Sequence, residues 1–520
     1  MKKIISLMLA IVMILSVAVM ASAVDYAEPF APGTMGSETY RIPALWTLNN
    51  GNVMAVADMR YDHGSDSPNN IDILAAFSED GYAEWDYSLV NYLDDYADDA
   101  TGTYSASYID SAVAQSSTGR IFVISDACPS GGGYWQAQEG SGFVEVNGNK
   151  YLLLTDAMYD DKLYTFNYYM GDFDANGIAI VYNRYDNEAK GIKANTATAY
   201  TVDKDFNLYK NGVALKTNQI NKDGSKGKEI NQNIFFGNSE LACYLTTYLL
   251  LKYSDDNGAT WSNPIFISAD VKSENEDFLG IGPGRGLVTQ YNGKERIIFA
   301  VYDNVGNGPT VHNENASTIY SDDNGLTWKR GAEVKCRSFM TKTSEAQIVE
   351  LGGGKLRMFA RNQGRYVAYA DSADGGHSWT KFRSDLDLPS NGNCMMSFIN
   401  AEVDGKQFVL GSYASSKKAR KDGVIRVGVV ENGDINWVNT YYFGGDFFAY
   451  SCMTQLADGN IGILYENEAA RISYMILTLD KDGNLSEING NNFEGYKNAP
   501  KTINAFVAFF DKIFSALGLI

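Results

Sequence analysis

Short apolar runs separated by polar turn residues recur along most of the chain. Each run is five to seven residues long and is bounded by Gly, Asn, Asp, Lys or Gln. Runs of this length between turn signals predict β-strands. The 34 tyrosines and 50 glycines agree, since Tyr favours strands and Gly favours turns. The pattern predicts an all-β protein with strands near Asn52–Ala57, Ile121–Ser125, Glu295–Val301, Lys355–Ala360, Gln407–Ser412 and Asn460–Tyr465.

An octapeptide recurs along the chain. Residues 254–261 read SDDNGATW, residues 321–328 SDDNGLTW and residues 372–379 SADGGHSW, while SEDGYAEW at residues 78–85 is a degraded copy. Its chemistry is that of a turn: Ser and Asp bond the local backbone, Gly takes a φ that other residues resist, and Trp packs beneath the hairpin.

The spacing of the octapeptides indicates the architecture. The three good copies begin 67 and 51 residues apart. That length holds about four short strands, which is one blade of a β-propeller. We therefore predict a six-bladed β-propeller, formed by residues 24–139 and 247–498.

The long gap after the degraded copy predicts an insertion. Residues 140–246 lack the octapeptide and show strand-like patterns at Thr198–Val202 and Leu208–Leu215. We interpret them as a small β-rich insert domain in the connection of one blade.

Both ends of the chain carry apolar segments. Residues 1–23 resemble a signal peptide, with Lys2 and Lys3 before an apolar stretch and Ala21-Ser22-Ala23 at the cleavage site. A retained membrane anchor is the alternative; otherwise the mature protein begins near Val24, is secreted or cell-surface, and has no membrane span. Residues 499–520 predict a short amphipathic helix, which either packs on the propeller or contacts a surface or partner.

Composition narrows the function classes. The hydrophobic fraction of 45% and charged fraction of 20% indicate a globular protein, and the net charge of −20 disfavours nucleic acid as a partner. The five cysteines are scattered without metal-ligand spacing and there are three histidines, so we expect no metal or cofactor. An exported protein without a disulfide framework is more typical of a bacterial exterior.

One motif connects the repeats to a known family. Tyr40-Arg41-Ile42-Pro43 precedes the first octapeptide, and this combination resembles the bacterial sialidases over residues 38–134 and 247–475. The resemblance implies a six-bladed propeller whose central mouth holds three arginines for the substrate carboxylate. A planar guanidinium suits a carboxylate because it donates two parallel charge-assisted hydrogen bonds.

The resemblance assigns the three arginines to Arg41, Arg361 and Arg420. Each alone would more often be a surface salt bridge, and Arg426 competes with Arg420. Arg60 matches the further arginine that contacts the C4 region of the sugar.

Two aspartates match further family positions. Asp66, in a loop rich in Gly, Ser and Asn, matches the general acid/base, with Asp72 as a competitor disfavoured by its strand-like neighbours. Asp110 matches the residue that accepts a hydrogen bond from the N-acetyl group of the substrate.

Tyr450 matches the nucleophile, Glu345 its partner base and Glu466 the carboxylate that holds Arg41. Sialidases with a tyrosine nucleophile are an exception among retaining glycosidases. Sialic acid carries a carboxylate on its anomeric carbon, and a neutral phenol avoids repulsion from it. The ordinary phenol pKa of about 10 requires help, so we expect Glu345 to take the proton and nearby arginines to favour the phenolate.

These assignments predict an exo-α-sialidase that hydrolyses terminal α-linked sialic acid from glycans or glycoproteins with retention, through a covalent sialyl-tyrosine. A rival function is that of an intramolecular trans-sialidase, which releases 2,7-anhydro sialic acid. Such relatives carry a tryptophan after the nucleophile, where residues 467–471 read NEAAR, although another loop could supply a ring. An inactive sialic-acid-binding lectin and a propeller scaffold without catalysis are two further rivals.

Overall fold

A computed structural model describes residues 27–61, 63–82, 84–97, 104–156, 163–305, 313–336, 342–390, 393–468 and 471–488. Strands dominate this part of the chain, and its helices are single turns: η1 (Thr34–Gly36), η3 (Leu163–Thr165), η4 (Glu188–Lys190) and α2 (Ser268–Val271). The all-β prediction is confirmed. The predicted signal peptide and C-terminal helix lie outside the described residues.

The propeller strands pair antiparallel in groups of four, or of five in the third group, and each group is a blade. The first three described groups are β1 (Thr39–Thr47), β2 (Val53–Arg60), β3 (Ile71–Ser78) and β4 (Asp86–Asn91); β5 (Ser107–Gln115), β6 (Ile121–Cys128), β17 (Tyr248–Ser254) and β18 (Ile265–Phe266); and β19 (Phe278–Ile281) with β21 (Leu287–Tyr291), β22 (Lys294–Val305), β23 (Asn313–Ser321) and β24 (Lys329–Arg330). The short β20 (Gly284–Arg285) pairs parallel with β5.

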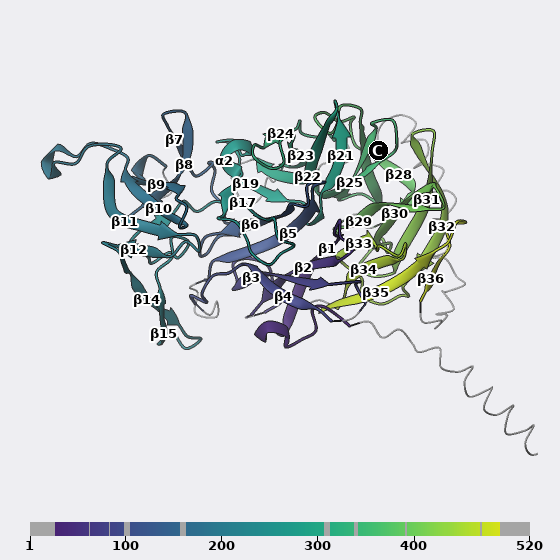
Figure 1. The fold of residues 1–520 in the computed structure, drawn as a ribbon, viewed down its shortest axis with the longest axis horizontal. Coiled ribbons are helices and arrows are strands. Elements are labelled where there is room, and N and C mark those ends of the chain that lie inside the picture. The colour runs from purple at the N-terminus through teal and green to yellow at the C-terminus, as the bar shows by residue number, and fades with distance from the viewer. Residues whose placement is uncertain are drawn as a thin grey trace, which may run out of the picture.

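The remaining described groups follow the same order. They are β25 (Thr343–Glu350), β26 (Leu356–Asn362), β27 (Tyr366–Ser372) and β28 (Arg383–Pro389); β29 (Ser397–Val403), β30 (Lys406–Ala414), β31 (Gly423–Glu431) and β32 (Asp434–Tyr442); and β33 (Ser451–Gln455), β34 (Ile461–Glu468), β35 (Arg471–Leu479) and β36 (Leu485–Glu487). The groups succeed one another around the right-hand body of Figure 1.

The second strands of the first two groups, β2 and β6, coincide with apolar runs of the sequence. Every residue of β2 and β6 is buried. A strand in this position is covered on both faces by neighbouring blades, so it is apolar almost throughout instead of alternating. The core of the molecule is therefore the set of apolar layers between blades.

The ring closes between the first and the last group. The Leu45 N–H donates to Cys452 Sγ at 3.2 Å, and the Thr47 N–H donates to Thr454 Oγ1 at 3.1 Å. These contacts join β1 to β33 across 407 residues of chain. The N-terminal strand is thus held against the C-terminal blade.

The octapeptides form the turns between the last two strands of their groups. In the copy that follows β17, Ser254 Oγ accepts the Gly258 N–H at 2.8 Å, and Asp256 Oδ1 accepts the Thr260 N–H at 2.9 Å. Gly258 has φ +89, where a side chain would be strained. The predicted turn chemistry is confirmed.

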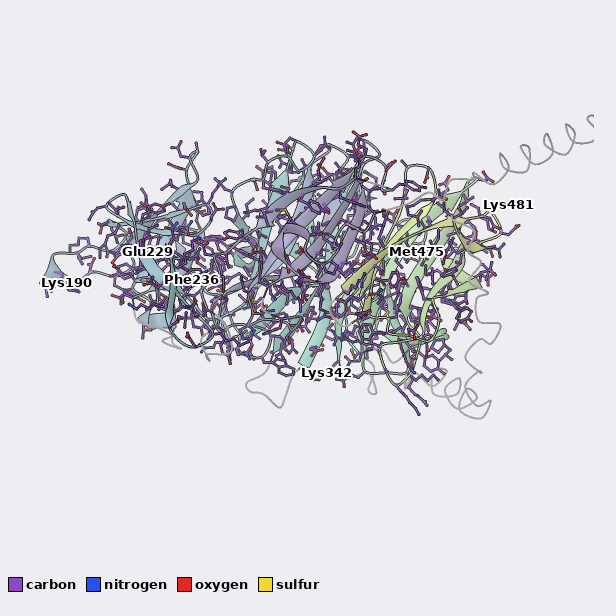
Figure 2. The ribbon with its side chains drawn as sticks, turned by 90° about the horizontal axis from the view of Figure 1, so that it is seen from below. Lys190, Glu229, Phe236, Lys342, Met475 and Lys481 are labelled. Atoms are coloured by element: carbon purple, nitrogen blue, oxygen red, sulfur yellow. The ribbon has the colours of Figure 1, made fainter. Side chains whose placement is uncertain are left out.

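A separate sheet projects from the propeller between β6 and β17. It contains β7 (Phe143–Val146), β8 (Asn149–Thr155), β9 (Tyr168–Phe173), β10 (Ile178–Asn183), β11 (Ala197–Asp203), β12 (Leu208–Lys210), β13 (Val213–Ala214) and β16 (Ala242–Cys243), with a hairpin of β14 (Lys216–Ile220) and β15 (Lys226–Asn231). This insert occupies one side of the molecule (Figure 1), and Lys190 marks its end farthest from Lys481 (Figure 2).

Both strand-like patterns of the insert are β-structure, but the second one contains a turn that was not predicted. The run Leu208–Leu215 is two short strands, β12 and β13, joined by a turn at Asn211 and Gly212, with φ 52 and 75. Asn-Gly is the preferred pair for a two-residue hairpin because both positions need positive φ. Among the helices of the described residues, none is long and apolar enough to cross a membrane.

Candidate active site

Three innermost strands are irregular at the same end of the propeller. The pairing register shifts between Arg41 and Ala44 in β1, between Ile109 and Ala112 in β5, and between Thr343 and Ala346 in β25. A β-bulge bends the strand and redirects the side chains beside it. The bulges therefore redirect Arg41, Asp110 and Glu345, which the alternation of a regular strand would not place together.

Two bulge residues have positive φ. Ile42 has φ 57 and Asp110 has φ 59. The value is a genuine outlier for the β-branched Ile42, whereas Asp is one of the residue types that adopt it more readily. The Ile42 N–H donates to Glu466 Oε1 at 3.1 Å, and the Asp110 N–H donates to Asp58 Oδ1 at 3.1 Å. Each of these residues is thus held by a buried carboxylate.

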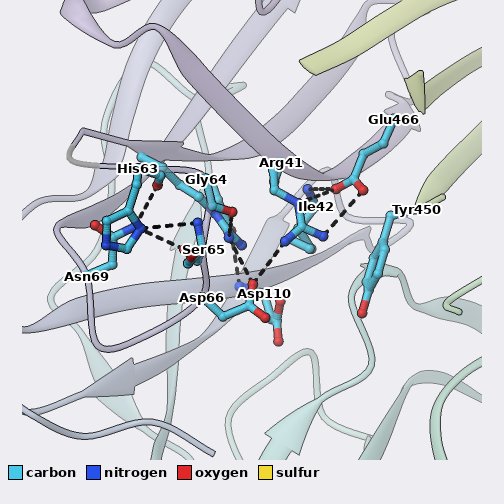
Figure 3. A network of polar contacts seen from close by, with 12 residues as sticks. Arg41, Ile42, His63, Gly64, Ser65, Asp66, Asn69, Asp110, Tyr450 and Glu466 are labelled. Atoms are coloured by element: carbon cyan, nitrogen blue, oxygen red, sulfur yellow. Dashed lines mark hydrogen bonds and ion pairs between the residues drawn. The ribbon is translucent and has the colours of Figure 1, made fainter. Parts of the chain in front are cut away.

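A cavity of about 200 Å³ lies over these bulges. Its lining includes five of the predicted site residues: Asp66, Asp110, Glu345, Arg361 and Tyr450. Figure 3 shows Arg41, Asp66 and Asp110 on one side and Tyr450 facing them.

Tyr450, Glu345 and Arg361 form one hydrogen-bonded unit. The Tyr450 hydroxyl donates to Glu345 Oε1 at 2.5 Å. Arg361 Nη1 donates to Glu345 Oε2 at 2.7 Å and to the Tyr450 oxygen at 3.0 Å. Tyr450 is 6% exposed and Glu345 3%. The geometry holds a phenol, a carboxylate and a guanidinium within hydrogen-bonding distance of one another.

The electrostatics of Tyr450 differ from the expectation. Burial and the Glu345 carboxylate raise the pKa of Tyr450 well above its ordinary value, and Arg361 and Arg420 lower it only in part. The phenolate is therefore not favoured in the open site. The raised pKa of Tyr450 favours the neutral phenol over the phenolate.

Arg41 is oriented by Glu466. Its Nε donates to Glu466 Oε1 at 3.0 Å and its Nη2 to Oε2 at 3.3 Å, while Nη1 donates to Asp66 Oδ1 at 3.1 Å. Glu466 is fully buried and Arg41 is 9% exposed. A bidentate pair between a planar guanidinium and a carboxylate fixes the plane of both groups.

Arg60 connects Asp66 to Asp58, a residue that was not predicted from the sequence. Its Nη1 donates to Asp66 Oδ1 at 2.8 Å and its Nη2 to Asp58 Oδ2 at 2.8 Å.

Desolvation would raise the pKa of Asp66, but Arg60 and Arg41 outweigh it and lower that pKa below its ordinary value. Asp58 is fully buried, and burial raises its pKa to about 7 in spite of Arg60. Asp58 could have been found from its i, i+2 spacing to Arg60, which puts both on one strand face.

Arg420 lies beside the nucleophile candidate. Its guanidinium carbon is 5.4 Å from the centre of the Tyr450 ring, and that of Arg41 is 5.6 Å away. Arg420 has no ion-pair partner within the part of the chain that the structure describes. All three predicted arginines thus surround Tyr450, and Arg420 is the one whose charge is not already paired.

The competitors lie elsewhere. Arg426 donates to the Asp387 carbonyl at 2.8 Å on another part of its blade. Asp72 is fully buried, accepts the Leu93 N–H at 2.9 Å and does not line the cavity.

An aromatic wall of the cavity was not predicted either. It is formed by Tyr134, Trp135, Phe278 and Tyr302. The only local signal was an aromatic pair after Gly131-Gly132-Gly133, which identifies a loop but not where that loop lies.

Comparisons with known proteins agree with this geometry. Residues 234–463 match a family model described as a BNR repeat-like domain. The chain is 31% identical to the anhydrosialidase of Macrobdella decora, covering 84% of this chain and 59% of that protein. It is 30% identical to sialidase B of Streptococcus pneumoniae, covering 82% and 61%. This chain therefore spans about three fifths of the length of those two relatives.

A solved structure is similar over nearly its whole length. The intramolecular trans-sialidase from Ruminococcus gnavus, in complex with oseltamivir carboxylate, is 31% identical with a TM-score of 0.75, covering 88% of this chain and 98% of that one. Because identity and fold agree over almost all of that relative, this chain belongs to the sialidase family.

Proposed function

We propose that this protein is an exo-α-sialidase that hydrolyses terminal α-linked sialic acid from glycans or glycoproteins with net retention. The observation that carries the proposal is the buried Tyr450–Glu345 pair at 2.5 Å, in the same cavity as Asp66. Membership of the sialidase family supports it. Binding alone would need no phenol held against a base.

In the first step, Tyr450 Oη attacks the anomeric carbon. The phenol proton passes to Glu345 as the new C–O bond forms, and Arg361 Nη1 stays within reach of both oxygens. The bond from the anomeric carbon to the leaving oxygen breaks as Asp66 gives that oxygen a proton. General base catalysis of this kind suits a phenol whose pKa is raised.

In the second step, water replaces the tyrosine. Asp66, now a carboxylate, takes a proton from the water that attacks the anomeric carbon, and Tyr450 leaves with the proton held by Glu345. Two displacements at one carbon give net retention.

Substrate binding prepares Asp66 for its acid role. In the open site Asp66 is paired with Arg41 and Arg60, which keep its pKa low. A substrate carboxylate that binds Arg41, Arg361 and Arg420 competes with Asp66 for Arg41 and partly neutralises its charge. The pKa of Asp66 then rises, so the acid becomes protonated when there is a leaving group to protonate.

The product distinguishes the candidate functions. Incubation with sialyllactose, followed by ¹H NMR, should show α-sialic acid before it mutarotates to the β-anomer. A 3-fluoro sialosyl fluoride should accumulate on the protein, and peptide mass spectrometry should locate the adduct on Tyr450. Release of the β-anomer first, or an adduct on another residue, would overturn the mechanism.

The second candidate is an intramolecular trans-sialidase that releases 2,7-anhydro sialic acid. It is favoured by the relatives named anhydrosialidase and intramolecular trans-sialidase and by the aromatic wall, which makes one side of the cavity apolar. The same NMR experiment identifies it by the bridged product. A lectin would leave sialyllactose intact while binding it.

The N-terminal and C-terminal segments support two further proposals. Residues 1–23 read as a signal peptide, so we infer export, with the mature chain secreted or at the cell surface of a bacterium. Residues 499–520 read as an amphipathic helix that contacts a surface or partner. Mass spectrometry of the exported protein should give a chain that begins near Val24, and deletion of residues 499–520 should release it from that surface.

A further inference from the structure

The aromatic wall ends in a tryptophan that is open to solvent. Trp135 lines the cavity and is 64% exposed. A large ring exposed at the rim of a polar cavity makes little contribution to the core, so it is a candidate contact for a ligand.

The ring of Trp135 is held in a defined position. It meets the Tyr134 ring edge-on at 4.9 Å. Tyr134 in turn meets Phe278 at 4.9 Å, and its hydroxyl donates to Glu314 Oε1 at 2.6 Å. The Ala137 N–H donates to the Gly133 carbonyl at 3.0 Å, which closes a turn around Trp135. A ring ordered in advance loses little conformational entropy when a ligand binds.

The loop that carries Trp135 touches the loop that carries Asp66. A Cβ placed on Gly133 would lie 2.6 Å from the Ser67 carbonyl oxygen, so only glycine permits this contact. Ser67 directly follows Asp66, and Trp135 is two residues beyond Gly133. The loop that carries Trp135 is therefore packed against the Asp66 loop at the rim of the cavity.

The chemistry requires the leaving group to be beside the Asp66 loop. Asp66 must reach the oxygen between the sialic acid and the next residue of the glycan. The sugar attached to that oxygen therefore lies next to the Asp66 loop and outside the cavity.

We propose that Trp135 is the platform on which the first sugar of the leaving group stacks. The indole suits the apolar C–H face of a neutral pyranose such as galactose, and the nearby Glu314 carboxylate disfavours an anionic one. Trp135 then determines specificity for glycan over small-alcohol leaving groups. This inference rests on the proposed sialidase activity.

The kinetic test compares two substrates that share a sialic acid and an alkoxide leaving group. Trp135→Ala should lower kcat/KM about tenfold for sialyllactose and less than about twofold for methyl α-sialoside, which has no second sugar. Trp135→Phe should restore most of the loss. Tyr185→Ala, which removes a 44%-exposed ring from the insert, is the matched control and should change neither substrate. Equal losses on both substrates, or no loss on either, would overturn the proposal.

A binding test separates this proposal from the proposed activity. The protein has 7 tryptophans, so 5-fluorotryptophan labelling gives a small set of ¹⁹F resonances, and the one missing in Trp135→Phe belongs to Trp135. Lactose alone, at millimolar concentration, should shift that resonance. If the wild-type protein cleaves no sialoside, the proposed sialidase activity is wrong, but the lactose-induced shift still tests whether Trp135 binds a sugar. An unshifted Trp135 resonance would refute the proposal that Trp135 is a stacking platform.

Discussion

The buried pair between Arg41 and Glu466 allows a quantitative prediction. Glu466→Gln keeps the size of the side chain but removes its charge. The amide retains one acceptor oxygen where the carboxylate accepts the Arg41 Nε and Nη2 hydrogens and the Ile42 N–H. One of these donors would then face an NH₂ group. Among the residues that the structure describes, Arg41 would keep only Asp66, which is 67% exposed on its loop, as an anionic partner.

The structure sets the size of the effect. Removing one partner of a buried ion pair costs about 3–5 kcal/mol because the other charge is left uncompensated. Asp66 offsets little of this, since an exposed ion is screened by water. We expect Glu466→Gln to lower the free energy of unfolding by about 3 kcal/mol or more. Loss of one charge-assisted hydrogen bond that orients Arg41 should lower kcat/KM by about 10- to 100-fold, mainly through KM.

Urea denaturation with an unchanged m-value measures the stability change. Asp255→Asn is the matched control because Asp255 is also bidentate to an arginine, with Oδ1 2.7 Å from Arg120 Nε and Oδ2 2.8 Å from Nη2. The Asp255 side chain is 57% exposed, so this change should cost less than about 1 kcal/mol. Equal costs for the two variants, or a Glu466→Gln protein with wild-type KM, would refute the argument from burial.

Three further predictions follow from the same geometry. Tyr450→Phe should lower kcat for sialyllactose by about 10³-fold or more while the urea midpoint stays near that of the wild type; near-normal turnover would exclude a tyrosine nucleophile. Asp66→Ala should lower kcat/KM about 100-fold for sialyllactose and much less for an activated aryl sialoside, and equal losses would contradict its acid role. Asp58 has a folded pKa of about 7, above its unfolded value, so its contribution to stability is present at acid pH and is lost as pH rises toward 7. The stability of Asp58→Asn relative to wild type should therefore rise by up to about 1.4 kcal/mol per pH unit between pH 4 and 7, and a flat difference would show that Asp58 titrates normally.

Local sequence predicted much of the fold. The strands β2 and β6 are covered on both sides, so they are largely apolar and stand out as runs in the sequence. The octapeptides were equally visible because their hydrogen bonds join residues two to four positions apart, as between Ser254 and Gly258. The hairpin of β12 and β13 was missed because Asn211-Gly212 interrupts an otherwise continuous pattern.

The site residues were recognised one at a time, from motifs around each of them. The family resemblance implied that Glu345 partners Tyr450 and that Glu466 holds Arg41, but no local pattern predicted these contacts. Glu345 and Tyr450 are 105 residues apart and Arg41 and Glu466 are 425 residues apart. Asp58 was hidden within a buried strand.

The sequence by itself therefore determined the strands, their turns and the chemical types of the site residues, because these depend on neighbours within a few positions. The tertiary structure decided the rest. Ring closure brings the innermost strands of different blades to one end, and bulges in β1, β5 and β25 redirect the side chains there. It also decided that the neutral phenol of Tyr450 is favoured, since burial and the Glu345 charge outweigh the arginines. Finally, it placed Trp135 at the cavity rim, because a loop contact at Gly133 depends on packing that no local pattern encodes.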